Sequence, residues 1–422
     1  MLASTSILSA QSNTRDRVHS VNKAIQKVTQ TKAKEQSVVE ELHSVVKSGK
    51  VSGQFRTLYS TYKNTNAPDT YATAVGGMLK YETAQYHGWS LAAAMITTND
   101  IRALSGEGQK HNSELSGERR SYTEVSEAYI DYQYKTLQLR VGRQIFDTPL
   151  ADSDDTFMVM NSFEAYTAFY TQKEWSVMLG HFDRWQGVDA DLDKGWIKTG
   201  KNGVSFAGLT YTNKFLDFNA WYYDFSNPSD EDLLNGDLAL ANRSLYTDIS
   251  AHLYFKKDFF LHLNGQYLLQ NSYDNSDVAA NIYGLMGEVV YNKLGVRLAY
   301  NKAQKESGKE SFVGYGGGGL YTSMDSVTLD VITQDRSAYA AVGILSYHYR
   351  RLKFLYAYGL FKGSANSQGV EAKIVEQNFG VKYEYNKSLT VAAIYALDRD
   401  RENPASLDYN DDNLRLFLAY NF

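Results

Sequence analysis

The last nine residues of the chain, Leu414-Arg415-Leu416-Phe417-Leu418-Ala419-Tyr420-Asn421-Phe422, alternate between two kinds of side chain. The even positions are all apolar or aromatic, whereas the odd positions include Arg415 and Asn421. Successive side chains of a strand point to opposite faces, so this segment predicts a strand with one face in an apolar medium. Its other face belongs in a polar interior, as in the wall of a membrane-spanning β-barrel.

The chain ends on Phe422, with Tyr420 two residues before it. An aromatic C-terminus that closes such a strand resembles the recognition signal of bacterial outer-membrane barrels, which their assembly machinery reads. Tyr420 and Phe422 are therefore candidates for an assembly signal. The alternative is a chance ending on an edge strand.

The same alternation of apolar and polar residues occurs in short segments from Val51 onward. Two kinds of connection separate these segments, and the two kinds alternate along the chain. One kind is short and polar, at 85–88, 135–136, 172–174, 213–214, 256–258, 292–293, 350–351 and 386–387. The other kind is mostly longer and rich in Asp, Ser, Asn and Gly, around 63–70, 98–121, 145–161, 185–202, 226–243, 272–277, 304–337, 363–373 and 399–411.

These connections separate about 18 strands and leave both chain ends on the side of the short turns, which is the geometry of an outer-membrane barrel. A soluble sandwich would not need all short turns on one side and all long loops on the other. We therefore predict an all-β transmembrane barrel of antiparallel strands over residues 49–422. The short turns would face the periplasm of a Gram-negative bacterium, and the barrel would lie in its outer membrane.

Composition agrees with this prediction. Tyrosine is abundant (33 residues) and proline is scarce (4), while the mean hydropathy is negative at −0.43. A barrel needs only every second residue to be apolar, so its mean hydropathy stays low. There is no run of apolar residues long enough for a helical membrane span. Cysteine is absent, and the net charge of −5 with no basic tract argues against a nucleic-acid partner.

Tyrosines recur just before the short turns, where an aromatic girdle is expected at the membrane interface. The examples are Tyr132, Tyr134, Tyr291, Tyr347, Tyr349, Tyr383 and Tyr385. Tyrosine is also a good strand former, so the repeated placement beside the turns is the informative feature.

The N-terminal part of the chain differs from the rest. Residues 1–10 resemble the end of a signal peptide, although the usual basic start is missing. Residues 11–48 contain neither Gly nor Pro and carry apolar residues at helical spacing, which predicts a short periplasmic helical segment ended by Ser48-Gly49. A coiled-coil or cell-wall-binding role for this segment is an alternative.

The third long loop, residues 145–161, mixes apolar side chains with the four carboxylates of Asp147, Asp152, Asp154 and Asp155. A loop that folds onto the barrel wall can bury its apolar groups, whereas a loop in solvent cannot. A barrel of this strand number encloses a wide aqueous passage, which porins narrow with an inserted loop and charged side chains. We therefore predict that this loop forms a pore constriction.

This segment resembles the corresponding stretch of the OprD-like porins, including the major outer-membrane porins of campylobacteria. The matching residues are Gly142, Pro149, Ser153-Asp154-Asp155 and Phe163, while Ala165 replaces the usual Gly. The local match covers about 25 residues, and the strand architecture covers most of the chain. The resemblance implies import of small solutes, often amino acids, peptides or carboxylates, past a loop that faces a ladder of basic side chains.

Strand parity predicts which charged side chains point into the lumen, because their apolar neighbours belong on the lipid face. The basic residues predicted to line the pore are Arg56, Arg140, Arg297, Lys353, Lys382 and Arg415. The acidic residues predicted inside are Glu127, Asp131, Asp248, Glu288 and Glu384. Together they would form a transverse field that orients solutes; alternatively, they are ordinary lumen residues paired with one another. A β-bulge would reverse such an assignment.

Other motifs carry weaker signals. The glycine run at 315–319 is followed by no Lys-Ser or Lys-Thr, so we interpret it as a flexible external loop and not as a phosphate-binding loop. His252 and His262 flank one short turn, but a metal site there lacks a third ligand. The aspartates of loop 145–161 lack the glycine and the distal Glu of an EF-hand, so calcium stays an open alternative to the predicted absence of cofactors.

Three functions compete. The first is a porin for ions and small hydrophilic solutes, with outer-membrane lipids, lipopolysaccharide and the assembly machinery as partners and with a homotrimer implied only by the resemblance. The second is a plugged surface barrel, structural or adhesive, whose N-terminal helix anchors it to the cell wall. The third, a barrel hydrolase, needs a catalytic set that the sequence does not offer. We predict a porin and no enzymatic activity.

Overall fold

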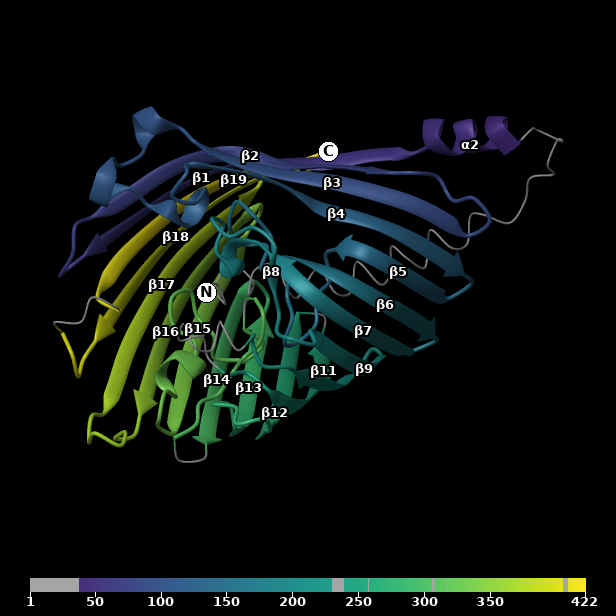
Figure 1. Ribbon diagram of the computed structural model, residues 1–422. Coiled ribbons are helices and arrows are strands. Elements are labelled where there is room, and N and C mark those ends of the chain that lie inside the picture. Colours follow the sequence, from purple (N-terminus) through teal and green to yellow (C-terminus); the bar gives the residue numbers. More distant parts are fainter. Residues whose placement is uncertain (1–37, 230–238, 257, 306–307, 317, 405–408) are drawn as a thin grey trace.

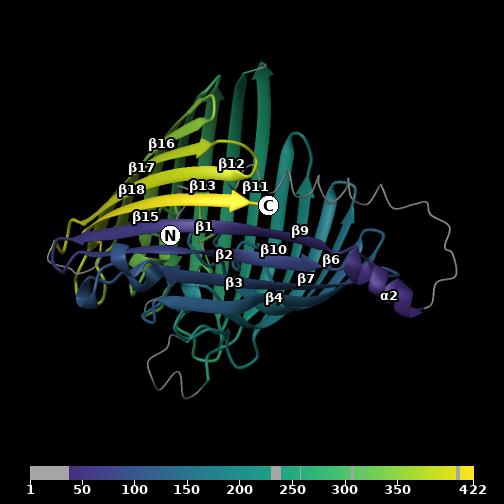
Figure 2. The ribbon, with the colours of Figure 1, turned by 90° about the horizontal axis from the view of Figure 1, so that it is seen from above.

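The computed structural model describes residues 38–229, 239–256, 258–305, 308–316, 318–404 and 409–422. They form one closed antiparallel barrel, in which each wall strand pairs with the wall strands before and after it in sequence and β1 pairs with both β2 and β19 (Figures 1 and 2). The pairing of the first strand with the last leaves no open edge, as a membrane-spanning sheet requires. The predicted fold class is confirmed.

The first strands are β1 (Lys50–Asn64), β2 (Thr70–Glu82), β3 (Trp89–Asp100), β4 (Ser121–Tyr134), β5 (Leu137–Gln144), β6 (Ser162–Gln172), β7 (Trp175–Gln186), β8 (Ile197–Lys198), β9 (Val204–Thr212) and β10 (Leu216–Phe225). The remaining strands are β11 (Asn242–Lys256), β12 (Phe259–Ser272), β13 (Ala280–Tyr291), β14 (Leu294–Lys305), β15 (Ala338–Tyr349), β16 (Leu352–Gly363), β17 (Ala372–Glu384), β18 (Leu389–Asp400) and β19 (Asp411–Asn421).

The strand boundaries follow the alternating turns and loops closely. β5 ends at Gln144 and β6 begins at Ser162, so the loop between them spans the predicted residues 145–161. One strand was missed: β8 is a two-residue strand within the loop between β7 and β9. It pairs with the end of β7 and leaves β7 and β9 as barrel neighbours, so the barrel wall keeps the predicted eighteen strands.

The helical part is small. The helix α2 (Val38–Lys47) lies beside the short-turn end of β1 and β2, where the Ala84 amide donates to the Val45 carbonyl at 3.1 Å. It confirms a helix in the C-terminal part of the predicted segment 11–48; residues 1–37, including the predicted signal-peptide remnant, lie outside the described residues. The long loops contain the 3-10 turns η1 (Arg102–Leu104), η2 (Gly108–Lys110), η3 (Ser113–Leu115), η4 (Val188–Ala190) and η5 (Asp330–Ile332). No described helix is long and apolar enough to cross a membrane.

The two faces of the wall differ as the last strand predicts. On β19, Leu416, Leu418 and Tyr420 are exposed on the outside, whereas Arg415 and Ala419 are buried on the inside. Exposed tyrosines precede the short turns, as predicted: Tyr134, Tyr291, Tyr347, Tyr349, Tyr383 and Tyr385. An apolar belt bounded by aromatic residues is the surface that a barrel presents to lipid.

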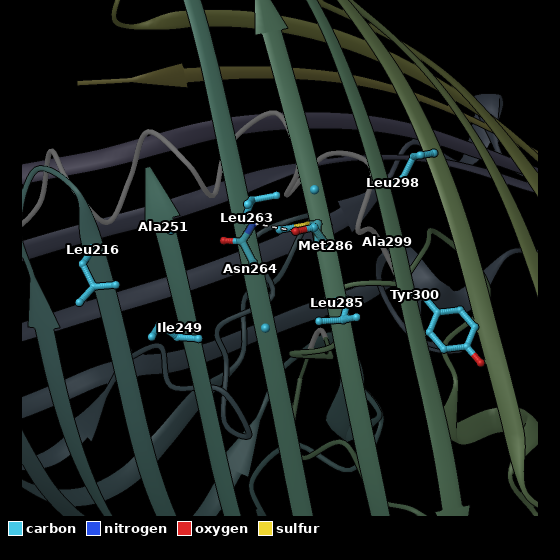
Figure 3. A pocket seen from close by; sticks show the side chains of 12 residues that line it. Leu216, Ile249, Ala251, Leu263, Asn264, Leu285, Met286, Leu298, Ala299 and Tyr300 are labelled. Atoms are coloured by element: carbon cyan, nitrogen blue, oxygen red, sulfur yellow. Dashed lines mark hydrogen bonds between the residues drawn. The ribbon is translucent and has the colours of Figure 1, made fainter. Parts of the chain in front are cut away.

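A shallow apolar groove illustrates the outer face (Figure 3). It has a volume of about 650 Å³ and crosses β10 to β14. Its lining includes the small residues Ala251, Gly265 and Gly287 and larger side chains such as Leu263 and Leu285. Its lining confirms that this part of the wall is apolar outside.

The buried core lies inside the barrel. One cluster joins inner-face residues of strands between β6 and β17 with two long loops, and a second joins β1 to β4 and β18 with the tip of the loop 145–161. A wide barrel can hold such a core only if segments other than strands fill part of its lumen. Two long connections therefore narrow the passage, and they position the candidate site.

Candidate pore constriction

The loop that joins β5 to β6, residues 145–161, crosses the lumen. At its start, the Phe146 ring stacks on Phe163 with centroids 4.6 Å apart, and the Leu150 amide donates to the Tyr223 hydroxyl on β10 at 3.3 Å. Farther along, Phe157 is fully buried against the opposite wall, where Leu58 of β1 belongs to the same cluster. The apolar side chains that marked this loop in the sequence are therefore buried against the wall.

The tip of the β5–β6 loop is held by two arginines of neighbouring strands. Arg56 on β1 forms an ion pair with Asp155 and donates to the Phe157 carbonyl at 2.5 Å. Arg415 on β19 lies over the Phe157 ring, 4.8 Å from its centroid. The two arginines belong to the predicted basic set, and both are almost completely buried.

The connection between β14 and β15, here called the β14–β15 loop, also folds into the lumen. Its Tyr315 exchanges two backbone hydrogen bonds with the β5–β6 loop, because the Asp152 amide donates to the Tyr315 carbonyl at 2.9 Å and the Tyr315 amide donates to the Leu150 carbonyl at 3.0 Å. The interpretation of residues 315–319 as a flexible external loop is therefore wrong for the described residues 315–316 and 318–319. Gly316 has φ +113°, and a Cβ there would lie 2.4 Å from the Asp152 carbonyl oxygen, so glycine permits the close approach of the two loops.

A second buried ion pair holds the tip of the β14–β15 loop. Asp325 pairs with Arg415. Beside it, the Glu376 carboxylate on β17 accepts from three successive backbone amides, those of Asp325 at 2.8 Å, Ser326 at 3.0 Å and Val327 at 2.8 Å. The two loops thus reach the same side of the barrel, formed by β17, β19 and β1.

The remaining predicted basic residues lie on the inner wall and have acidic partners. Arg140 contacts Asp131 at 2.9 Å, and Arg297 contacts Glu288 at 3.2 Å. Lys353 and Lys382 both contact the Glu384 carboxylate, each at 3.1 Å. Each basic residue that was predicted to point inward thus contacts a carboxylate, either on the inner face of the wall or in a loop.

On β4, the alternation of inward and outward side chains is interrupted. A β-bulge opposite Ala94 and Met95 places both Ser126 and Glu127 on the buried side. Glu127 contacts Lys80 of β2 at 2.9 Å, so it does face inward as predicted. Asp248 also faces inward and accepts from the Asn219 amide nitrogen at 2.9 Å.

The four predicted aspartates divide into two environments. Asp147 and Asp155 are exposed, whereas Asp152 and Asp154 are largely buried beside Asp189 from the loop after β7. Burial, followed by repulsion from Asp147, raises the pKa of Asp152 to about 7. Burial, followed by repulsion from Asp189, raises the pKa of Asp154 to about 7, and burial also raises the pKa of Asp189. The carboxyl groups of Asp152 and Asp154 are therefore protonated in a large fraction of molecules near pH 7.

The residues considered as metal ligands can be located in the structure. Within the described parts of the chain, no three His, Asp or Glu side chains are arranged to hold a metal ion. His252 and His262 face each other across β11 and β12 with ring centroids 4.8 Å apart, and His252 contacts Asp217 at 2.7 Å. Calcium at the β5–β6 loop stays an untested alternative.

Sequence reasoning missed Asp325, Glu376 and Asp189 as members of the loop attachments. Glu376 had a detectable signal, because it shares the inward parity of Asn378, Lys382 and Glu384 on β17. Asp325 and Asp189 lie in irregular loops without periodicity, so no pattern marked them.

The comparisons with known proteins agree with the fold. No family model matches the sequence, and no curated protein resembles it. Solved structures do resemble the barrel, among them OccAB3 of Acinetobacter baumannii, with 12% identity, a TM-score of 0.73, and coverage of 89% of this chain and 100% of that chain. OpdK of Pseudomonas aeruginosa, solved with vanillate, has 16% identity, a TM-score of 0.73, and coverage of 90% and 99%. OccK8 (OprE) of the same organism has 12% identity, a TM-score of 0.71, and the same coverage.

These neighbours are outer-membrane porins of the OprD family, and porins are not enzymes. The chain has the fold of the OprD-family porins.

Proposed function

We propose that the protein is an outer-membrane porin, a passive diffusion channel for ions and small hydrophilic solutes in a Gram-negative bacterium. One observation carries this proposal: a closed barrel with an apolar outer belt has a charged inner wall that is narrowed by two loops. The barrel and the belt suit a bilayer, and the charged interior suits water and polar solutes. Transport is driven only by the solute gradient.

The constriction would work by electrostatics. Asp147 and Asp155 are the exposed carboxylates of the β5–β6 loop, and Arg140, Lys353 and Lys382 are the most accessible of the predicted basic residues on the wall. Charges of both signs around a narrow passage create a field that orients a dipolar solute without binding it tightly. The cationic wall and the acidic loop would together select among small polar solutes.

A second candidate function is a plugged surface barrel, structural or adhesive. The buried Arg415–Asp325 pair and the Arg56–Asp155 pair favour it, because they hold both loops across the lumen. In that case the helix α2 at the short-turn end would connect the barrel to the cell wall. The two candidates differ in one measurable property, which is conduction.

Single-channel recording in planar bilayers tests the proposal. A porin gives discrete conductance steps in symmetric salt, whereas a plugged barrel gives no steps. Heat-modified mobility on gels shows independently that the barrel is folded. A liposome-swelling panel of sugars, amino acids and carboxylates then identifies the solute class. Vanillate belongs in that panel, because the similar barrel OpdK was solved with vanillate.

The assembly and membrane partners are further parts of the proposal. Tyr420 and Phe422 are exposed on the last strand, and the Phe422 ring lies 5.6 Å from Phe55 on β1, where the barrel closes. This position supports the proposal that Tyr420 and Phe422 form an assembly signal, which the assembly machinery would recognise before β1 and β19 pair. Outer-membrane lipids and lipopolysaccharide would surround the apolar belt, and a homotrimer stays an expectation from the resemblance.

A further inference from the structure

One register row on the outer face of the barrel carries three lysines and three tyrosines. The residues directly opposite one another from β12 to β17 are Tyr267, Tyr283, Lys302, Tyr339, Lys362 and Lys373. Lys302 is exposed between the buried residues Asn301 and Ala303, so its side chain points away from the lumen. Residues that lie directly opposite each other share a face. The lysines of this row therefore belong to the lipid-facing surface and not to the pore.

The row lies at the long-loop end of the apolar belt. Lys302 is close to the start of the β14–β15 loop, and Lys362 and Lys373 flank the connection between β16 and β17. The long loops of an outer-membrane barrel face the cell surface, so the row lies at the level of the outer-leaflet headgroups. Tyrosine rings favour this interface, and those of Tyr300 and Tyr339 stack beside Lys302 with centroids 6.0 Å apart.

The positive charge of this row has no partner within the described parts of the chain, where none of the three lysines forms an ion pair. Lys362 and Lys373 lie directly opposite each other, and like charges in that arrangement are destabilising. Lysines of the inner wall differ, since Lys80, for example, pairs with Glu127. An anion from outside the chain would therefore stabilise the outer row.

An apolar groove adjoins the row. The part next to Lys302 has a volume of about 410 Å³ and is also lined by Tyr283, Leu285 and Tyr300. Leu285 and Tyr300 border the groove of about 650 Å³ across β10 to β14 as well, so the two hollows adjoin (Figure 3). Together they form an apolar surface with an ammonium group at its extracellular end.

We propose that Lys302, Lys362 and Lys373, with the groove beside them, form a binding site for the lipid A part of lipopolysaccharide. The ammonium groups would contact the phosphates of the headgroup, and an acyl chain would lie in the groove. Neighbouring strands are about 4.8 Å apart, so the backbones at Lys302 and Lys373 are about 14 Å apart. A headgroup with two phosphates suits this span better than a phospholipid with one. The inference requires the outer-membrane location but not conduction through the lumen.

Native mass spectrometry of the detergent-solubilised full-length barrel tests the site, with lipid A that carries both phosphates as the titrant. In the triple variant Lys302→Gln/Lys362→Gln/Lys373→Gln, we expect Kd to rise about a hundredfold, because each ammonium group near an anionic lipid surface contributes roughly a factor of five. Heat-modified mobility on gels checks that the variant is folded. Absence of lipid A binding to the unaltered barrel, or an unchanged Kd in the folded variant, would overturn the proposal.

The matched control is the triple variant Lys135→Gln/Lys214→Gln/Lys293→Gln. These lysines lie in short turns at the other end of the barrel, so the control removes the same charge far from the groove. An equal loss of affinity in the control contradicts the site, because the net charge of the barrel would then explain binding. Equal affinity for dephosphorylated lipid A or for phosphatidylglycerol also contradicts it, because the phosphates of lipid A would then decide nothing.

The double variant Gly265→Val/Gly287→Leu tests the groove with the lysines intact. An added Cβ at either glycine meets nothing closer than 3.7 Å, so larger side chains can fill the groove without displacing a neighbour. We expect weaker binding of lipid A, since the acyl chain loses its place on the wall. Unchanged affinity would overturn the proposal, because the groove would then take no part.

The lipid titration is independent of the proposed channel function, because it needs no conduction. A barrel that conducts but does not bind lipid A retains the channel function and loses the lipid site. A barrel that gives no conductance steps but binds lipid A through the three lysines retains the lipid site and loses the channel function.

Discussion

The β5–β6 loop and the β14–β15 loop both cross the lumen, but they are held by ion pairs in different environments. The pair Arg56–Asp155 has a carboxylate side chain that is 45% exposed. The pair Arg415–Asp325 is 4% and 2% exposed, and Glu376 accepts three further hydrogen bonds beside it. Both loops also bury apolar side chains, among them Phe146 and Phe157 in the β5–β6 loop and Val327 and Leu329 in the β14–β15 loop.

The difference in the burial of the two ion pairs indicates which charge changes would detach each loop from the barrel wall. A partly exposed ion pair contributes little, on the order of 0–1 kcal/mol. Removal of one member of a buried pair leaves an uncompensated charge and costs about 3–5 kcal/mol. The β14–β15 loop should therefore be sensitive to single charge changes, and the β5–β6 loop should resist them.

The largest effect is expected from Arg415→Met, which leaves the buried Asp325 carboxylate without its cation inside the barrel. We expect the tip of the β14–β15 loop to be held less firmly, with a loss of about 3–5 kcal/mol for its attachment. Single-channel conductance should rise, and proteases should cut the loop in the folded barrel. Unchanged conductance and an intact loop would contradict the difference between the two loops. Arg56→Met is the comparison, with a smaller change.

A smaller effect is expected from Gly316→Ala, which disturbs the contact between the two loops. The positive φ of Gly316 and the nearby Asp152 carbonyl predict a loss of about 1–3 kcal/mol. Gly308→Ala is the matched control in the same loop, because Gly308 also has a positive φ of +72° but nothing within 4 Å of an added Cβ. Cross-linking yield between the two loops measures the contact. Equal losses in both variants would mean that backbone strain alone, and not the close approach, decides the effect.

The buried aspartates predict a pH dependence of the loop junction. The pKa values of Asp152 and Asp154 are raised to about 7, so the folded loops favour the protonated carboxyl groups. The stabilisation is therefore present at acidic pH and is lost as the pH rises through about 7. Channel noise and protease sensitivity should increase between pH 5 and pH 9. The double variant Asp152→Asn/Asp154→Asn should show no such increase, and an equal increase there would refute the assignment.

The smallest structural effect is expected from charge removal at the exposed tip of the β5–β6 loop. The double variant Asp154→Asn/Asp155→Asn should reduce cation preference, read from reversal potentials in asymmetric salt. The structure divides this effect unequally, because Asp155 is exposed and Asp154 is buried. Asp155→Asn alone should thus give most of the change in reversal potential. If Asp154→Asn alone gives most of it, the placement of the two residues is wrong.

Much of the barrel could be predicted because its pattern is local. The alternation of Leu416, Leu418 and Tyr420 with Arg415 and Ala419 requires only that one side of the strand meets lipid and the other meets water. The loop 145–161 was recognisable for a similar reason. Its apolar residues would be exposed in an external loop, and the structure buries Phe146, Leu150 and Phe157.

The contacts between loops could not be predicted, because no local pattern encodes them. The glycine run around Gly316 is read from sequence as a flexible segment, yet its lack of side chains is what allows the β14–β15 loop to approach Asp152. Asp325 meets Arg415 over a separation of 90 residues, and only the closure of the barrel brings them together.

The sequence by itself determined the alternation of faces, the order of turns and loops, and hence a barrel with a polar interior. Each strand in a bilayer has one face in lipid and one face in the polar lumen, so the alternation of apolar and polar residues is present in each segment. Only the tertiary structure decided which lumen charges are neutralised and which are left in excess. That choice depends on distances between strands and loops far apart in the chain, as the shared carboxylate of Lys353 and Lys382 illustrates.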